Sequence, residues 1–263
     1  MKVVLYLCTC KSQAKLQNFK TKRMKTTGNT IFISGGSAGI GLAIAKKFSA
    51  SGNKVIINGR SGQRLEKALS ALENAAAIQG DLSIEADRIR IAEDLKANHP
   101  EVNIIVNNAG AAFGYLLSET TNAHEKAAIE MNTNYLAIIH FTELMLPQLL
   151  QKEEAAIANV TSIAVFGSHK FLPTYGATKA ALHAYTTALR MTYEETKNLQ
   201  VYEIYPPLVN TEFSAEIGGA NGIPPAEVAS EFFIALQNDQ FDVPVGETKK
   251  YAAAISEAIS KIS

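Results

Sequence analysis

Tyr175 and Lys179 stand four residues apart in the stretch Thr174–Lys197, whose apolar spacing predicts a helix. Residues at that spacing share one helix face, so we expect the phenol and the ammonium to lie close together. A free tyrosine has a pKa of about 10, too high for an efficient base at neutral pH, and a nearby positive charge favours the phenolate. The pair therefore predicts a proton-transfer site at Tyr175, with its pKa lowered by Lys179.

Ser162 adds a hydroxyl group to this predicted site. It follows the short apolar run Ala155–Thr161, which reads as a buried strand, and it precedes Tyr175 by thirteen residues. Its hydroxyl could hydrogen-bond a substrate oxygen at the end of that strand.

A glycine-rich turn, Gly35 to Gly41, lies between the β-rich run Thr30–Ser34 and the helical pattern Ile40–Ala50. Glycines allow backbone angles that other residues resist and let the chain approach a phosphate closely. The amino end of the following helix presents free N–H groups and the positive end of its dipole. This strand–turn–helix setting predicts a site for the diphosphate of a dinucleotide.

The next predicted strand, Lys54–Asn58, is followed by Gly59 and Arg60. A dinucleotide without a 2′-phosphate usually finds an acidic residue here, which accepts hydrogen bonds from the ribose hydroxyls. Neither residue can do so, whereas the Arg60 guanidinium suits a phosphate. The sequence therefore favours NADP(H), with NAD(H) as the alternative.

Short apolar runs alternate with longer helical stretches along the rest of the chain. Further strands are expected at Ala76–Gln79, Asn103–Val106, Gln200–Ile204 and Asp242–Val245. Further helices are expected at Gln63–Glu73, Glu85–Lys96, Ala123–Leu150 with a bend near Pro147, Pro225–Leu236 and the C-terminus, and a loop at Glu212–Ile223. This alternation predicts an α/β fold: one doubly wound Rossmann-type domain, whose parallel seven-stranded sheet carries helices on both faces.

Charge is unevenly distributed along the chain of 263 residues. Residues 1–25 hold seven basic groups and no acidic one, and the remainder holds 18 basic against 25 acidic residues, a net of −7. The acidic body argues against a nucleic-acid partner, and no apolar stretch is long enough to predict a membrane span. We therefore expect a cytoplasmic protein with one NAD(P)-binding catalytic domain over residues 26–263.

Residues 1–25 are interpreted as a disordered basic leader or a non-native extension, since Met24 could itself be a start residue. Both cysteines, Cys8 and Cys10, lie in this segment. Two thiols without nearby histidines fall short of a metal site, so no metal is expected.

These features, in this order, resemble the short-chain dehydrogenase/reductase family, in its common type of about 250 residues, over residues 28–247. The glycine turn matches the family pattern with Ser34 in place of threonine, and Asn107 to Gly110 reproduces the motif after the fourth strand. Asp81 and Leu82 resemble the pair that contacts the adenine.

The resemblance implies a hydride transfer between a nicotinamide and a carbonyl or secondary alcohol, with Tyr175 as general acid/base. The implied catalytic residues are Ser162, Tyr175, Lys179 and Asn134. In the family the lysine also holds the nicotinamide ribose, and the asparagine holds a water in a proton relay through the lysine. The implied cofactor contacts are Gly35, Ser37, Gly39, Ile40, Gly41, Arg60, Asp81, Leu82, Asn108, Ala109, Gly110, Tyr175, Lys179, Pro206, Val209 and Thr211.

One departure from the family lies after the sixth strand, where Pro206 is followed by Pro207 rather than glycine. Pro207 lacks an N–H and has a fixed φ, so the backbone near the nicotinamide must take a path that is not left-handed. Thr211 still matches the residue that contacts the carboxamide or the phosphates.

The segments expected around the substrate are apolar and carry few charges. They supply Ala164, Val165, Phe166, Phe171, Leu172, Phe213 and Ile217. The substrate is therefore expected to be a small hydrophobic carbonyl compound or alcohol. By resemblance, the long helices predict a homodimer or homotetramer. Two alternatives remain: a non-catalytic NADP(H)-binding regulator, and an epimerase or dehydratase of the same fold.

Overall fold

A seven-stranded, fully parallel sheet forms the centre of the computed structural model, which describes residues 24–196 and 198–261. Its strand order is β3-β2-β1-β4-β5-β6-β7, so the order reverses between β1 and β4. The strands are β1 Thr30–Ile33, β2 Lys54–Gly59, β3 Ala75–Gln79, β4 Ile104–Asn107, β5 Ala155–Val160, β6 Leu199–Tyr205 and β7 Asp242–Pro244. The predicted α/β class and doubly wound sheet are confirmed.

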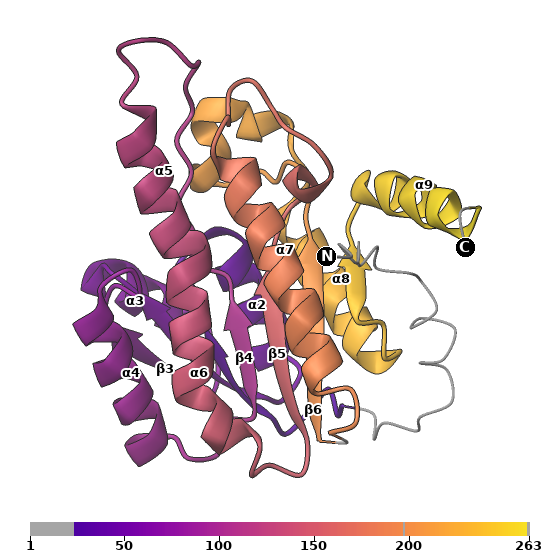
Figure 1. The fold of residues 1–263 in the computed structure, drawn as a ribbon. Coiled ribbons are helices and arrows are strands. Elements are labelled where there is room, and N and C mark those ends of the chain that lie inside the picture. Colours follow the sequence, from indigo (N-terminus) through magenta and orange to yellow (C-terminus); the bar gives the residue numbers. More distant parts are fainter. Residues whose placement is uncertain (1–23, 197, 262–263) are drawn as a thin grey trace, which may run out of the picture.

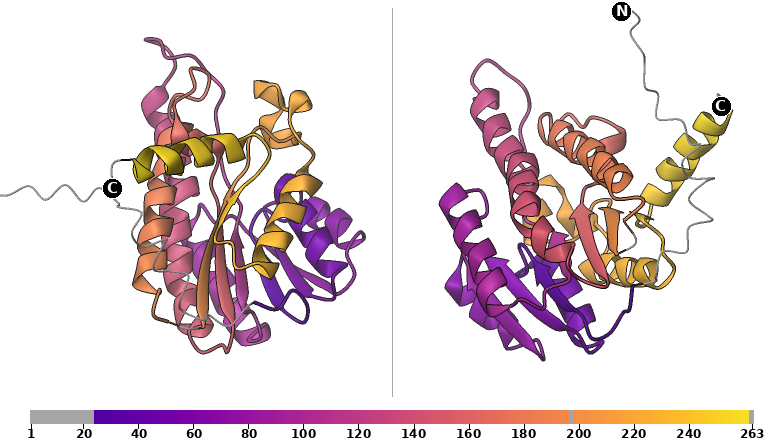
Figure 2. Two further views of the ribbon diagram at one scale, coloured as in Figure 1. Left: turned by 90° about the vertical axis from the view of Figure 1, so that its right-hand side faces the viewer. Right: turned by 60° about the horizontal axis from the view of Figure 1, so that its bottom comes forward.

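Helices cover both faces of the sheet, as Figures 1 and 2 show. The helices of the described chain are α2 Gly39–Ser49, α3 Gly62–Leu69, α4 Glu85–Asn98, α5 Ala123–Met131, α6 Ala137–Leu149, α7 Tyr175–Thr192, α8 Pro225–Gln237 and α9 Thr248–Ser260, of which α9 lies away from the sheet faces (Figure 1). One buried apolar cluster joins α2, α3 and α8 to the sheet, and a second joins α4, α6 and α7. Both sheet faces are therefore buried, which explains the nearly continuous apolar strands.

The long helix expected over Ala123–Leu150 is interrupted, contrary to the prediction. A π-helical turn, η2, spans Asn132–Leu136 between α5 and α6, and Ala137 donates its backbone N–H to Asn132 O, five residues earlier. Pro147 lies inside α6, which continues to Leu149. The apolar periodicity on either side of the turn is helical, so periodicity alone did not reveal the extra residue.

Two other helices end earlier than predicted. α3 ends at Leu69, after which Ala71 and Leu72 close tight turns onto Ala68 and Leu69. α7 ends at Thr192, because the chain must turn back before β6 begins at Leu199. The loop expected at Glu212–Ile223 contains two short 3₁₀ helices, η4 Glu212–Ile217 and η5 Gly219–Asn221.

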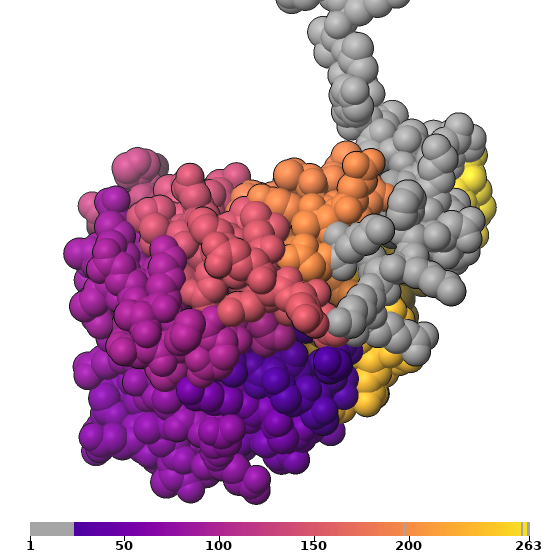
Figure 3. Space-filling view, turned by 90° about the horizontal axis from the view of Figure 1, so that it is seen from below, coloured from indigo at the N-terminus to yellow at the C-terminus, as the bar shows by residue number. Residues whose placement is uncertain are grey.

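The start of the described chain packs on the domain. Met24 is buried in the cluster beneath α2 and α8, and Lys25 donates its backbone N–H to the Glu154 carboxylate. Figure 3 shows this part, in indigo, between the magenta and yellow parts of the chain. The predicted leader otherwise lies outside the described residues, as do both cysteines. Within the described residues, no helix is long and apolar enough to cross a membrane.

Candidate active site

The glycine turn between β1 and α2 leaves little room for side chains. Gly35 and Gly39 have φ values of +64° and +54°, in the left-handed region that favours glycine. A Cβ atom on Gly41 would lie 2.6 Å from Asn108 Nδ2 and closer still to Gly35 O. The first turn of α2 has no side-chain cap, so its N–H groups face the turn. These features fit a diphosphate at the amino end of α2.

Ser34 joins the glycine turn to the segment after β4. Its hydroxyl accepts hydrogen bonds from the backbone N–H groups of Asn108 and Ala109, at 2.9 and 3.0 Å. The Asn108 side chain donates in return to Ser34 O, at 2.9 Å. Serine thus does at this position what a threonine hydroxyl would do. The two motifs lie together where the strand order reverses, which is where doubly wound sheets bind ligands.

Arg60 lies at the rim of a pocket of about 410 Å³, which Gln79, Gly80, Asp81, Asp87 and Arg90 also line. Its side chain is 82% exposed and lies 3.9 Å from the Asp81 carboxylate. Asp81 accepts hydrogen bonds from the backbone and side chain of Ser83, which shapes the turn after β3. Two guanidinium groups and two carboxylates line this pocket, and Arg90 of α4 is paired with Asp87 at 2.8 Å, so the exposed Arg60 is the group best able to bind an anion.

Tyr175, Lys179 and Ser162 come together at the carboxyl ends of β5 and β6, and all three are buried. Lys179 Nζ donates to Val160 O at 2.8 Å and lies 5.7 Å from the centre of the Tyr175 ring. The Ser162 side chain interacts with Tyr175, and its hydroxyl accepts from Ala164 N at 3.1 Å. Tyr175 and Lys179 therefore lie on one face of α7, as expected.

The lowering of the Tyr175 pKa that we expect from the Lys179 ammonium and an oxidised nicotinamide is opposed by burial. Burial raises the pKa of Tyr175 well above its ordinary value of 10, although the hydrogen bond with Ser162 opposes this and the Glu130 carboxylate adds to it. Burial also lowers the pKa of Lys179 from 10.5 to about 8, against the charge of Glu203. Desolvation dominates both shifts because the two side chains are enclosed by protein.

Asn134 lies in the π turn with its side chain fully buried. It accepts from Ala111 N and donates to Ala111 O and to Thr178 Oγ1, at 2.8 to 2.9 Å. A Cβ atom on Gly110 would lie 3.1 Å from Asn134 Oδ1 and 3.9 Å from Lys179 Nζ. Asn134 and Lys179 thus converge at Gly110. This glycine ends the Asn107–Gly110 motif after β4, here named the β4 motif.

The segment after β6 returns to the glycine turn. Pro206 O accepts from Ile163 N at 2.9 Å, which ties it to the residue after Ser162. Thr211 begins η4 with a capping box to Ser214, and its methyl group lies 3.2 Å from the position of a Cβ on Gly39. Val209 pairs with Ile223 in an isolated bridge. Pro207 is absent from the residues with positive φ, as expected.

The predicted substrate-pocket residues divide into two groups. Phe213 is half exposed, with its ring centre 6.3 Å from that of Tyr175, and Ile217 lies against Gly114. Phe166 instead stacks on Tyr205 at 5.8 Å, and Phe171 packs with His169 near the surface. Phe213 is therefore the apolar side chain of this set that lies beside Tyr175, and Ile217 lies against the segment after β4.

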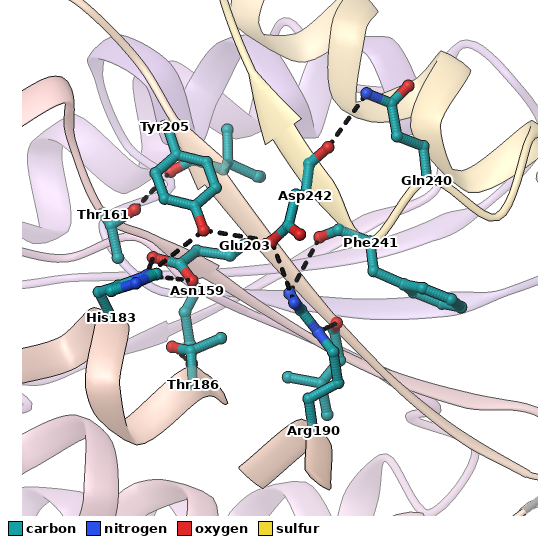
Figure 4. Close-up of polar contacts among 12 residues, drawn as sticks. Asn159, Thr161, His183, Thr186, Arg190, Glu203, Tyr205, Gln240, Phe241 and Asp242 are labelled. Atoms are coloured by element: carbon teal, nitrogen blue, oxygen red, sulfur yellow. Dashed lines mark hydrogen bonds and ion pairs between the residues drawn. The ribbon is translucent and has the colours of Figure 1, made fainter. Parts of the chain in front are cut away.

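Two buried glutamates were missed by the sequence reasoning. Glu130 on α5 and Glu203 on β6 are both fully buried. Glu203 pairs with His183 of α7 at 3.0 Å, next to the Tyr205 and Asp242 side chains (Figure 4). A signal was present: Glu203 interrupts an apolar strand, and Glu130 precedes Asn134 by one helical turn.

The strand order, the uncapped glycine turn and the polar residues at the carboxyl ends of the strands define an NAD(P)-binding oxidoreductase. The family model for short chain dehydrogenases matches residues 29–221. The chain belongs to the short-chain dehydrogenase/reductase family and is an NAD(P)-dependent enzyme of it.

Relatives and solved structures agree with this assignment. The chain is 36% identical over 211 residues to the uncharacterized oxidoreductase DltE of Bacillus subtilis, covering 80% of this chain and 83% of the relative. It is 33% identical over 192 residues to the NADP-dependent 3-hydroxy acid dehydrogenase YdfG of Salmonella typhi, covering 70% and 75%. A short-chain dehydrogenase from Burkholderia cenocepacia in complex with NADP shares the fold, with a TM-score of 0.78 at 22% identity, covering 89% and 94%.

Proposed function

We propose that this enzyme transfers hydride between NADP(H) and a small hydrophobic ketone, aldehyde or secondary alcohol, with Tyr175 as the proton-transfer group. The observation that carries the proposal is the buried Tyr175 hydroxyl, with Ser162 beside it and Lys179 one helical turn away. The bound dinucleotide supplies the hydride. The fit of that dinucleotide rests on the close packing at Gly41 and the uncapped start of α2.

Tyr175 donates a proton to the substrate oxygen during reduction and accepts it during oxidation. Ser162 orients that oxygen through its hydroxyl, and the Lys179 ammonium stabilises the phenolate that reduction leaves behind. Burial raises the pKa of Tyr175 and so favours the neutral phenol, the form that donates a proton in reduction. Asn134 keeps the end of the β4 motif beside Lys179, and a water held there would return the proton.

The preference for NADP(H) rests on Arg60 and its pocket. The Arg60 side chain is largely exposed and its nearest carboxylate, Asp81, is 3.9 Å away, so the guanidinium can turn to a 2′-phosphate. Arg90 lines the same pocket but is paired with Asp87 at 2.8 Å, so the preference rests on Arg60. The NADP-dependent relative from Salmonella supports the same preference.

A homodimer or homotetramer remains our proposal for the assembly. Ile129, Leu136 and Met191 on the α5–α6 and α7 surfaces are each more than half exposed, at 51%, 51% and 62%. Light scattering at micromolar concentration should give at least a dimer, and a monomer would contradict the proposal. The cytoplasmic location stays a prediction.

The test is a spectrophotometric screen of NADPH oxidation across hydrophobic aldehydes and ketones. The parent enzyme should turn over some of them, and Tyr175→Phe should retain dinucleotide binding but lose turnover. A Tyr175→Phe variant as active as the parent would remove Tyr175 from the mechanism. A parent that binds NADPH yet reduces nothing would favour the regulatory alternative.

A further inference from the structure

The fully buried Glu130 carboxylate joins two parts of the active-site wall that are distant in sequence. Its Oε1 accepts from Phe113 N at 2.9 Å, and its Oε2 accepts from Thr174 Oγ1 at 2.6 Å. Phe113 belongs to the segment that follows the β4 motif, and Thr174 immediately precedes Tyr175. Burying a carboxylate costs free energy unless its oxygens accept hydrogen bonds, and here each of the two oxygens accepts one.

Glu130 is the middle member of a regular series of contacts. Lys126, Glu130 and Asn134 follow one another at four-residue intervals on the same side of the helix. They contact residues 115, 113 and 111 of the extended segment at Ala111–Tyr115, here named the 111–115 segment. Every four residues along the helix correspond to two residues along the facing segment. The three contacts therefore hold the whole segment along this helix.

The same helix face also reaches α7. Glu130 bonds Thr174 and Asn134 bonds Thr178, so the four-residue interval repeats on the second helix. The Tyr115 hydroxyl lies 2.8 Å from Thr174 Oγ1. Because Thr174 donates its one hydroxyl hydrogen to Glu130, Tyr115 must be the donor to Thr174. The 111–115 segment is thereby bonded to the residue before Tyr175.

The 111–115 segment borders the crevice in which the substrate is expected. It starts after Gly110, beside Lys179 and Asn134, and Gly114 faces Ile217 of the loop after Thr211. Tyr115 N also donates to Phe171 O at 3.1 Å, in the turn before α7. A shift of this segment would therefore disturb its contacts with the residue before Tyr175 and with Ile217.

We propose that Glu130 is a positioning residue that fixes the 111–115 segment against α7 and so sets the carbonyl site beside Tyr175. The inference rests on the proposed function of that site. Glu130 has a second consequence, since its negative charge raises the pKa of Tyr175. Geometry and charge can be separated experimentally, because glutamine can keep the first and remove the second.

Glu130→Gln is the isosteric variant. Its amide oxygen can accept from Phe113 N, and its NH₂ group can donate to Thr174, which then donates to Tyr115. We expect kcat within about threefold of the parent, while the pH dependence of alcohol oxidation moves to lower pH because the charge that disfavours the phenolate is gone. A loss of rate without a shift in pH would contradict the electrostatic part of the inference.

Glu130→Ala removes both bonds. We expect kcat/KM for the carbonyl substrate to fall about ten- to a hundredfold, the range for a lost bond to a charged group, with the Kd for NADPH within about twofold of the parent. Thr174→Val tests the same bond without touching Glu130, and Thr174→Ser, which keeps the hydroxyl, is its matched control. Loss in Thr174→Val and retention in Thr174→Ser support the inference; equal rates in both overturn it.

A second measurement does not depend on turnover. Hydrogen–deuterium exchange of the 111–115 segment should accelerate in Glu130→Ala and stay at the parent level in Glu130→Gln, because Phe113 N loses its acceptor only in the first. Unchanged exchange in Glu130→Ala would overturn the inference whatever the activity. If the parent reduces no carbonyl compound but the exchange differs as expected, the proposed function fails and the positioning by Glu130 stands.

Discussion

Replacing Gly41 with alanine tests the dinucleotide site most directly. The new Cβ would lie 2.6 Å from Asn108 Nδ2, whereas ordinary contact begins near 3.4 Å, so the turn and the β4 motif must separate by most of an ångström. The near neighbours are Gly35 backbone and an amide already bonded to Ser34 O, and neither can move without breaking a contact. The clash therefore acts on the turn that would hold the diphosphate.

The magnitude follows from two effects. Overpacking of this kind costs roughly 1–3 kcal/mol of folding free energy. A displaced turn also loses at least one charge-assisted hydrogen bond to a phosphate, which corresponds to about ten- to a hundredfold weaker binding. We expect Gly41→Ala to melt several degrees below the parent, and the Kd for NADP, measured by isothermal titration, to rise by that factor.

Gly52→Ala is the matched control. Gly52 has a φ of +78° with no atom within 4 Å of its added Cβ, and it lies in the turn before β2, away from the glycine turn. It should lose about 1–2 kcal/mol of stability through backbone strain and keep the parent Kd. If Gly41→Ala binds NADP as tightly as Gly52→Ala at equal stability, the glycine turn does not hold the diphosphate.

Three other predictions concern charged side chains. Arg60→Glu should raise the Kd for NADPH at least about tenfold and change that for NADH little, because it replaces attraction to the 2′-phosphate with repulsion; an unchanged ratio of the two constants would remove Arg60 from the site. Burial lowers the pKa of Lys179 to about 8, so the stability of the parent should rise with pH from about 8 towards 10.5, where the unfolded chain binds more protons. Lys179→Met should lack this rise in urea unfolding and, at neutral pH, gain up to roughly 3 kcal/mol while losing turnover. Pairing with Glu203 raises the pKa of His183, so its contribution to stability should be full below about pH 6.5 and be lost as the pH rises through the raised value; Glu203→Gln should flatten that dependence.

The sequence predicted those features that depend on neighbouring residues. The strands were predicted because each is a short apolar run, and the glycine turn because it joins a strand to a helix. The prediction that Tyr175 and Lys179 share a helix face required only their four-residue interval. Their presence together with Ser162 at one edge followed from the parallel sheet, since the carboxyl ends of its strands meet there.

Features that depend on three-dimensional surroundings were not predicted. The pKa of Tyr175 moves opposite to the expectation because enclosure of the phenol outweighs the effect of nearby charge. Glu130 looks like a surface residue of a polar helix until the 111–115 segment covers it. The π turn was missed because the apolar pattern before and after it is that of an ordinary helix, and one additional residue changes only the phase between the two halves.

That π turn restricts which length changes the chain can accept. Deleting one residue from Asn132–Leu136 would restore α-helical hydrogen bonding but rotate α6 against α5 by about 100°. Either Asn134 would leave α7 or the apolar side of α6 would leave the sheet. Alignments of relatives should therefore show gaps in the exposed connection before α5, at residues 116–121, and a constant length from Glu130 to Phe141.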